Sequence, residues 1–257
     1  MKKLLIKTEL NISRYSVGIA DNYKETDELH KLRYDIFNVE LGEGIKENEA
    51  IQRDIDKFDA HCDHLIVKDN SDEKIIATYR IHPSWQIHNE GFYTSTEFNI
   101  SKLGLEKRRT IEVGRACIHT EHRGNLVIAI LWMAIKEYCT NNKVEALFGT
   151  ASVPKCNIEE LSAMYQSLVS RGHLINDGSV TPLPEQRAHL IPNPPETFRK
   201  ELLGSLLKGY LKLGAKLIGE PVFDPIFRCY DFFVILEMKN ANWDYIDSLA
   251  KFLNLES

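Results

Sequence analysis

Apolar residues recur along the chain with two different periods, and these periods predict its helices and strands. The clearest change of period lies within residues 110–139. From Ile111 to Ile118, apolar residues fall among β-forming residues in a short run, as in a strand. From Val127 to Tyr138 they recur every three to four positions, as in an amphipathic helix. This stretch therefore predicts a strand, a tight turn and a helix.

The same patterns predict elements along the rest of the chain. Apolar or alternating runs predict further strands over 15–20, 63–68, 75–81, 144–153 and 230–238. The longer period predicts further helices over 25–40, 158–171, 198–217 and 242–255. Repeated prolines over 182–195 predict a stiff connection, which we interpret as a lid. We therefore expect a single mixed α/β domain over 1–257, with its core at about 12–175 and 222–238 and the lid with a basic helix at about 180–218.

Composition narrows the class of protein. The 257 residues are 43% hydrophobic, enough to bury a substantial core. A net charge of -5 and a pI near 6.0 argue against binding nucleic acid through overall basicity. The five cysteines form no Cys-x-x-Cys pair, which favours free thiols in a reducing compartment. We therefore expect a cytoplasmic protein.

The beginning of the chain has some features of a secretory signal. Met1-Lys2-Lys3 is followed by an apolar run, but Lys7 and Glu9 interrupt that run before it reaches a usable length. No segment of the sequence approaches the roughly 20 apolar residues of a membrane span. We expect a protein that is soluble or, at most, peripheral at the inner face of a membrane.

The segment from Asp54 to His64 is rich in acidic residues and histidines. Its ligand types could hold a divalent cation, but their spacing matches neither a calcium loop nor a zinc-binding helix, so no metal site is expected. A mouth lined by carboxylates would instead attract a substrate amine, which enters as a cation. Asp59 is our candidate for that contact, with a solvated loop charge as the alternative.

The turn between the central strand and helix is a candidate anion site. Residues 120–125 would leave backbone N–H groups of the helix N-terminus open beside an arginine. Arg123, Gly124 and Asn125 are therefore candidates for binding a phosphate group.

Three lysines in the predicted helix over 198–217 form a possible docking face. Lys208, Lys212 and Lys216 recur at every fourth position, which places them on one side of a helix. A solvated helix face is one reading, and contact with a carrier protein or a membrane surface is the other.

Several short motifs together resemble one protein family. They are Leu32 to Phe37, Asp56 to His64, Ala77 to Arg80, Glu112 to Arg115, and Leu206 to Tyr210 followed by Asp224-Pro225. The combination resembles the ornithine-lipid type N-acyltransferases of the GNAT superfamily, which are similar in turn to acyl-homoserine-lactone synthases. The resemblance covers most of residues 25–237. It implies the mixed α/β GNAT fold, here with a C-terminal helical extension.

The donor-binding turn of the GNAT superfamily usually reads Gln/Arg-x-x-Gly-x-Gly/Ala. Arg123 matches its first position, whereas Leu126 and Ile128 stand where the pattern has small residues. Bulky residues keep a backbone from closing around an anion, so this departure argues against tight binding of a CoA pyrophosphate. A phosphopantetheine arm carried by a protein remains open.

The resemblance also implies roles for individual residues. Glu112 would be the general base and Arg115 an orienting residue, with a structural ion pair as the alternative. These two are three apart, so they face the same way only if the strand carries a bulge, as strands of this superfamily do. Arg33 and Arg80 would join Asp59 in binding substrate, and Arg33 could instead extend its charge to solvent.

The implied reaction is attack by the α-amine of an amino acid, of ornithine or glycine type, on a fatty acyl thioester. Acyl carrier protein would be the partner, its acyl-phosphopantetheine the donor, and no cofactor would be tightly bound. One alternative is an acyl-homoserine-lactone synthase, disfavoured because Glu43 stands where that family usually carries a Trp. Another is a non-catalytic or membrane-active protein that kept the fold.

Overall fold

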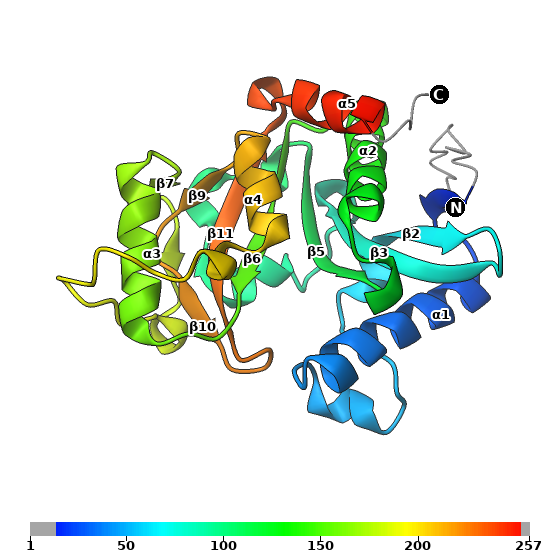
Figure 1. Cartoon of the computed structure of the whole chain (residues 1–257), viewed down its shortest axis with the longest axis horizontal. Helices are drawn as coiled ribbons and strands as arrows, with labels where there is room; N and C mark the ends of the chain where they lie inside the picture. Colours follow the sequence, from blue (N-terminus) through cyan, green and yellow to red (C-terminus); the bar gives the residue numbers. More distant parts are fainter. Residues whose placement is uncertain (1–13, 253–257) are drawn as a thin grey trace. The chain divides into compact units, whose positions relative to one another are not determined.

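The computed structural model describes residues 14–252 (Figure 1). The chain divides into two compact units, and the division falls within strand β5 (Thr110–Ile118). The first unit comprises Met1–Glu90, Val113–Val144 and Trp243–Ser257. The second unit comprises Gly91–Glu112 and Glu145–Asn242.

The first unit is built on antiparallel strands. β1 (Tyr15–Ile19) pairs with β2 (Asp63–Asp69), and β2 pairs with β3 (Lys74–Pro83). β3 is followed in the sheet by β5. The strands predicted over 63–68 and 75–81 are confirmed, and they form a hairpin whose register shifts at Val67/Lys68 through a bulge.

Helices cover this sheet. Helix α1 (Tyr23–Tyr34) continues as a π-helix (Asp35–Glu40), which together confirm the helix predicted over 25–40. α1 packs on β3, whereas α2 (Asn125–Asn141) packs on β1, β2, β3 and helix α5 (Trp243–Phe252), as Figure 1 shows. The cluster beneath α1 consists of buried side chains from both layers, namely Leu29, Leu32, Ile36, Ile66, Ile75 and Cys117.

The second unit has its own strands and helices. Its strand order is β6 (Ala146–Val153), β11 (Cys229–Glu237), β9 (Lys216–Ile218) and β7 (Leu174–Ile175), and β10 (Val222–Asp224) also pairs with β11. β4 (Phe98–Asn99) pairs with β8 (Thr181–Pro182). The helices are α3 (Ile158–Ser170) and α4 (Ser205–Lys212). Aromatic rings fill the core between these elements, with Phe148 packed against both Phe92 and Phe233.

The helix predicted over 198–217 is wrong in its extent. Gly204 (φ +48°) precedes α4, and Gly214 (φ +91°) follows it, and these left-handed conformations interrupt the helical backbone. Lys216 therefore lies in β9, where its ammonium donates to the Gly172 carbonyl at 2.6 Å. Lys208 and Lys212 remain one turn apart on α4 and are exposed. The predicted face of three lysines is thus reduced to two.

The proline-rich segment is anchored to α3. Ile191 donates its backbone N–H to the Ser162 hydroxyl at 3.0 Å, and the Gln166 side chain donates to the Pro192 carbonyl at 3.1 Å. These bonds hold the segment at two neighbouring points. The role of a lid stays a prediction.

Some predictions concern the ends of the chain. The Met1-Lys2-Lys3 segment and the last residues of the helix predicted over 242–255 lie outside the described residues. Over residues 14–252, every helix is too short or too polar to cross a bilayer. All five cysteines are free thiols, as predicted.

Candidate active site

A buried network of three arginines and three aspartates lies in the first unit. Its members come from α1, from the loop before β2, from β3 and from β5, and they are Arg33, Arg80, Arg115, Asp54, Asp56 and Asp59. All are buried or nearly so, and the side chains of Arg33 and Asp54 are fully inaccessible. The charges of the six side chains sum to zero, which is how a protein interior tolerates ionised groups.

Arg33 is the centre of this network. Its Nε donates to Asp54 Oδ1 at 2.8 Å, and its Nη1 donates to Asp59 Oδ1 at 2.8 Å. Its Nη2 bonds to both carboxylates, at 2.5 Å to Asp54 and 3.2 Å to Asp59. The planar fork of a guanidinium suits such double contacts. The reading of Arg33 as a charge extended to solvent is therefore wrong.

Two further arginines complete the arrangement. Arg80 Nη1 donates to both Asp56 oxygens at 2.7 Å, and it lies 3.3 Å from Asp59 Oδ1. Arg115 Nη2 donates to Asp56 Oδ2 at 3.0 Å. Arg115 adopts φ +52°, a left-handed conformation that is uncommon for a side chain of this size. This conformation marks an irregularity of β5 at the position where the resemblance implied one.

The environment of Asp59 bears on its predicted role. Its carboxylate accepts bonds from Arg33, Arg80 and the Asp56 backbone N–H. Burial opposes its ionisation, but the guanidinium groups of Arg33 and Arg80 outweigh burial and hold the pKa of Asp59 well below its usual range. Asp59 is therefore an ionised, buried group and not a solvated loop charge. Its contact with a substrate amine stays a prediction.

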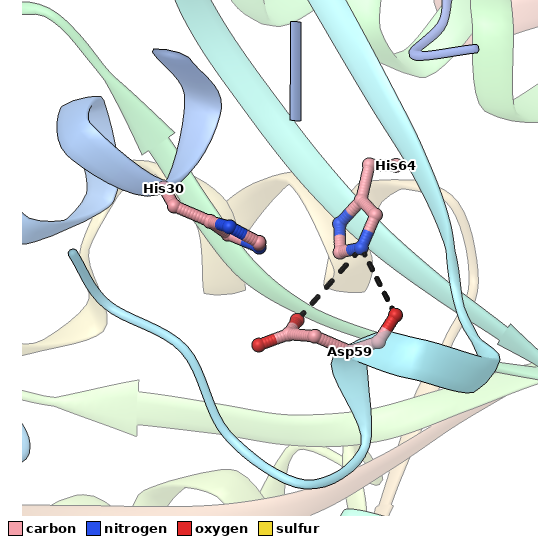
Figure 2. A group of neighbouring side chains, drawn as sticks. All are labelled: His30, Asp59 and His64. Atoms are coloured by element: carbon pink, nitrogen blue, oxygen red, sulfur yellow. Dashed lines mark hydrogen bonds and ion pairs between the residues drawn. The ribbon is translucent and has the colours of Figure 1, made fainter. Parts of the chain in front are cut away.

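Two histidines flank this carboxylate. Figure 2 shows the rings of His30, from α1, and His64, from β2, beside Asp59. The His64 Nε2 atom lies 3.3 Å from the Asp59 carbonyl oxygen and 3.9 Å from Oδ1. Burial lowers the pKa of His64 to about 4, and it also lowers the pKa of His30. Both imidazoles are therefore neutral at neutral pH, and our sequence analysis assigned neither a role.

Because the pKa of His64 is lowered in the folded protein, we expect the protein to lose stability in mild acid. Below pH 6.5 His64 binds a proton in the unfolded chain, whereas in the folded protein it stays neutral until about pH 4. The free energy of unfolding should therefore fall by about 3 kcal/mol from this residue as pH drops from 6.5 to 4, since each tenfold difference in proton affinity is worth about 1.4 kcal/mol. Urea unfolding across this range should show a shallower decline for His64→Gln. Parallel curves for the two proteins would contradict the prediction.

Glu112 lies in the second unit and is also buried. Its Oε1 accepts from the Thr94 backbone N–H at 2.6 Å and from the Thr94 hydroxyl at 2.5 Å. Its Oε2 accepts from the Tyr93 backbone N–H at 2.9 Å. The carboxylate thus holds the short 3-10 helix Tyr93–Thr96, a contact that no periodicity in the sequence indicated. Its role as general base and that of Arg115 as orienter stay predictions.

The predicted donor turn links β5 to α2. The Arg123 guanidinium bonds to the Glu40 carboxylate at 2.6 and 2.8 Å, and the pair is partly exposed. Gly124 has φ +155°, a conformation that side-chain-bearing residues rarely adopt. Among the described side chains none caps the start of α2, so these leave its first N–H groups without a side-chain cap. The side chain of Asn125 lies outside the described part of the structure.

Comparison with known proteins shows which protein family this chain resembles. Residues 32–133 match the acetyltransferase (GNAT) domain family. The L-ornithine N(alpha)-acyltransferase of Brucella abortus (strain 2308) is 30% identical over 252 residues, covering 91% of this chain and 88% of that protein. The protein of the same name from Rhizobium meliloti (strain 1021) is 30% identical over 249 residues, covering 92% of this chain and 84% of that protein.

Solved structures share the fold at low sequence identity. An N-acyl amino acid synthase from uncultured soil microbes matches with a TM-score of 0.53 and 12% identity, over 93% of this chain and 97% of that one. A CoA-dependent acyl-homoserine lactone synthase matches with a TM-score of 0.52 and 12% identity, over 91% of this chain and 84% of that one. These likenesses confirm the predicted mixed α/β GNAT fold. With the relatives above, they show that the chain is an acyltransferase of the GNAT superfamily and belongs to the family of L-ornithine N(alpha)-acyltransferases.

Proposed function

We propose that this protein transfers a fatty acyl group, of the 3-hydroxy type, from acyl carrier protein to the α-amine of an amino acid, as the first step in making an aminolipid. The observation that carries the proposal is the 30% identity, over 91% of the chain, to a protein named for acylating the α-amine of ornithine. Ornithine is accordingly the first substrate to test, and glycine the second.

The reaction needs a neutral amine beside a thioester. The amine nitrogen attacks the thioester carbonyl carbon, the C–N bond forms, the C–S bond breaks, and the pantetheine sulfur leaves with the electrons of that bond and takes up a proton to become the thiol. The amine must give up a proton during this sequence, so a general base within hydrogen-bond reach is required. Glu112 is our proposed base because it is a carboxylate held in place by three donated hydrogen bonds.

The donor site that we propose is the turn before α2. The uncapped N-terminus of this helix, from Asn125 to Asn141, presents backbone N–H groups and a positive dipole end, which favour an anion. An exposed ion pair such as Arg123 with Glu40 is worth at most about 1 kcal/mol, so an arriving phosphate can compete for the guanidinium. Leu126 and Ile128 leave less room for a pyrophosphate, which supports a carrier-borne donor over CoA.

The buried arginine–aspartate network would support the substrate side of the site. Arg33 and Arg80 both bond to Asp59, so the three residues predicted to bind substrate form one connected unit, in which the inaccessible Arg33 would act through Asp59. A network in which each charge has a partner holds its members rigidly. We propose that it fixes the loop of Asp54–Asp59 as one wall for the amine. Lys208 and Lys212 on α4 remain the candidate contact for the acidic carrier protein or a membrane surface.

The test is direct detection of the product. Purified protein would be incubated with 3-hydroxyacyl carrier protein and a mixture of amino acids, with matching reactions that contain acyl-CoA or omit the protein, and analysed by mass spectrometry. We expect an N-acyl amino acid whose mass identifies the amine, formed faster from the carrier protein than from CoA. Equal rates from the two donors would overturn the argument from Leu126 and Ile128. Absence of any amide product would overturn the proposed function.

A further inference from the structure

A second chemically distinct cluster lies on the surface of the first unit, at the end of β5. His119 directly precedes a single turn of 3-10 helix (Thr120–His122), and His122 is the last residue of that turn. The two imidazole rings lie close together, with their centroids 5.8 Å apart. Glu121 lies between them in sequence, and one ligand atom from each of the three residues lies within 4.8 Å of the others.

We propose that His119, Glu121 and His122 form a binding site for a divalent transition metal ion of the zinc type. Two imidazoles and one carboxylate are a ligand set that zinc accepts, with further positions left for water. In such a site the ligand atoms lie about 3.3 Å apart, because each bond is about 2.0–2.1 Å long. His119 and Glu121 are exposed, so small side-chain rotations are enough to bring the atoms together.

The surroundings of the turn support this assignment because they hold its backbone. The His119 backbone N–H donates to the Ile76 carbonyl at 2.8 Å, which fixes the turn to β3. Glu40, in the π-helix after α1, accepts from the Thr120 hydroxyl at 2.7 Å, which ties the turn to that helix. Ligands on a fixed backbone lose less freedom when they bind a metal.

His122 also has the outer partner typical of a metal-bound histidine. Its Nδ1 lies 3.1 Å from the Tyr15 hydroxyl and 3.9 Å from Asp69 Oδ2. A metal bound at Nε2 would leave the proton on Nδ1, where the Tyr15 oxygen accepts it, and such outer bonds fix the ring and its tautomer. The bond from the Glu121 backbone N–H to His119 Nδ1 is long, at 3.4 Å, so losing it would cost little.

Two other groups of ligand-type residues lie in the described part of the chain. Asp59 of the group with His30 and His64 already bonds to Arg33 and Arg80, whose positive charges oppose a cation there. In the second unit, the Asp224, Cys229 and Asp231 group is buried, and Asp224 Oδ1 accepts the backbone N–H groups of Ile226 and Phe227 in a turn. The third group is at the surface, and the neighbouring Arg123 guanidinium is already paired with Glu40.

The test uses zinc alone as the probe, on the full-length protein. Isothermal titration with Zn²⁺ should show about one equivalent bound, and His119→Gln and His122→Gln should each weaken binding at least about tenfold. The matched control is His61→Gln, because His61 stacks on His88 outside this cluster and its loss should leave the affinity unchanged. Thermal unfolding of each variant without metal verifies that it is folded.

A second measurement separates this site from the free thiols. Cys62 and Cys156 are partly exposed and could also bind zinc. Co²⁺ bound by thiolate gives a strong sulfur-to-metal charge-transfer absorption in the near ultraviolet, whereas nitrogen and oxygen ligands do not. We expect Co²⁺ to bind without that band. A thiolate band, no measurable binding of Zn²⁺, or equal affinity in the wild type and both cluster variants would each overturn the proposal.

Discussion

Replacing Arg33 by methionine is expected to lower the free energy of unfolding by about 3–5 kcal/mol. Methionine fills much of the volume of the arginine stem, so the change chiefly removes charge and hydrogen bonds. Arg33 is wholly inaccessible and bonds to both Asp54 and Asp59. Without it, two buried carboxylates lose a shared cation, and removing one partner from a buried ion pair costs about this much.

A matched control lies on the same unit. Arg53 also pairs with an aspartate through two bonds of 2.8 Å, to Asp27, but both side chains are partly exposed. Arg53→Met should therefore cost no more than about 1 kcal/mol, as exposed ion pairs do. Urea unfolding followed by circular dichroism measures both variants. If Arg33→Met does not accumulate as folded protein, Asp59→Asn tests the same network with a milder change. A loss in the free energy of unfolding as small as that of Arg53→Met would show that the buried network contributes little to stability.

Much of the fold could be predicted because the spacing of hydrophobic residues along the chain differs between helices and strands. The strand from Thr110 to Ile118 and the helix from Asn125 to Asn141 both lie where the period changed. The helix predicted over 198–217 fails for a physical reason. The helical spacing of its Leu and Lys residues continues past Gly204 and Gly214, but the backbone adopts a left-handed conformation at both glycines. The spacing therefore predicted a helix that extends beyond the two points where the helical backbone is interrupted.

The candidate site shows where local patterns stop being informative. The sequence indicated Arg33, Asp59 and Arg80 individually, but it did not indicate Asp54 and Asp56 as their partners. Those two lie in an irregular loop, and a loop has no repeating pattern from which the direction of a side chain can be predicted. Pairing of Arg33 with Asp54, 21 positions further along the chain, depends on tertiary structure. The hydrogen bonds from Tyr93 and Thr94 to Glu112 were missed for the same reason.

Replacing Glu112 by glutamine is expected to lower kcat by about 10²–10⁴-fold, the usual range for a lost general base. Glutamine has nearly the same shape, and its carbonyl oxygen can still accept the bond from the Thr94 backbone N–H, now 2.6 Å long. It cannot accept a proton from the amine. The rate of thiol release from acyl carrier protein, measured at saturating ornithine, would report kcat.

The competing explanation is that Glu112 only holds the turn over Tyr93–Thr96, and Thr94→Val separates the two roles. This variant removes the hydroxyl that donates to Oε1 but keeps the carboxylate, so we expect kcat to fall less than tenfold. Equal losses of rate and of melting temperature in the two variants would favour the structural role. A glutamine variant with nearly full kcat would mean that another group takes the proton.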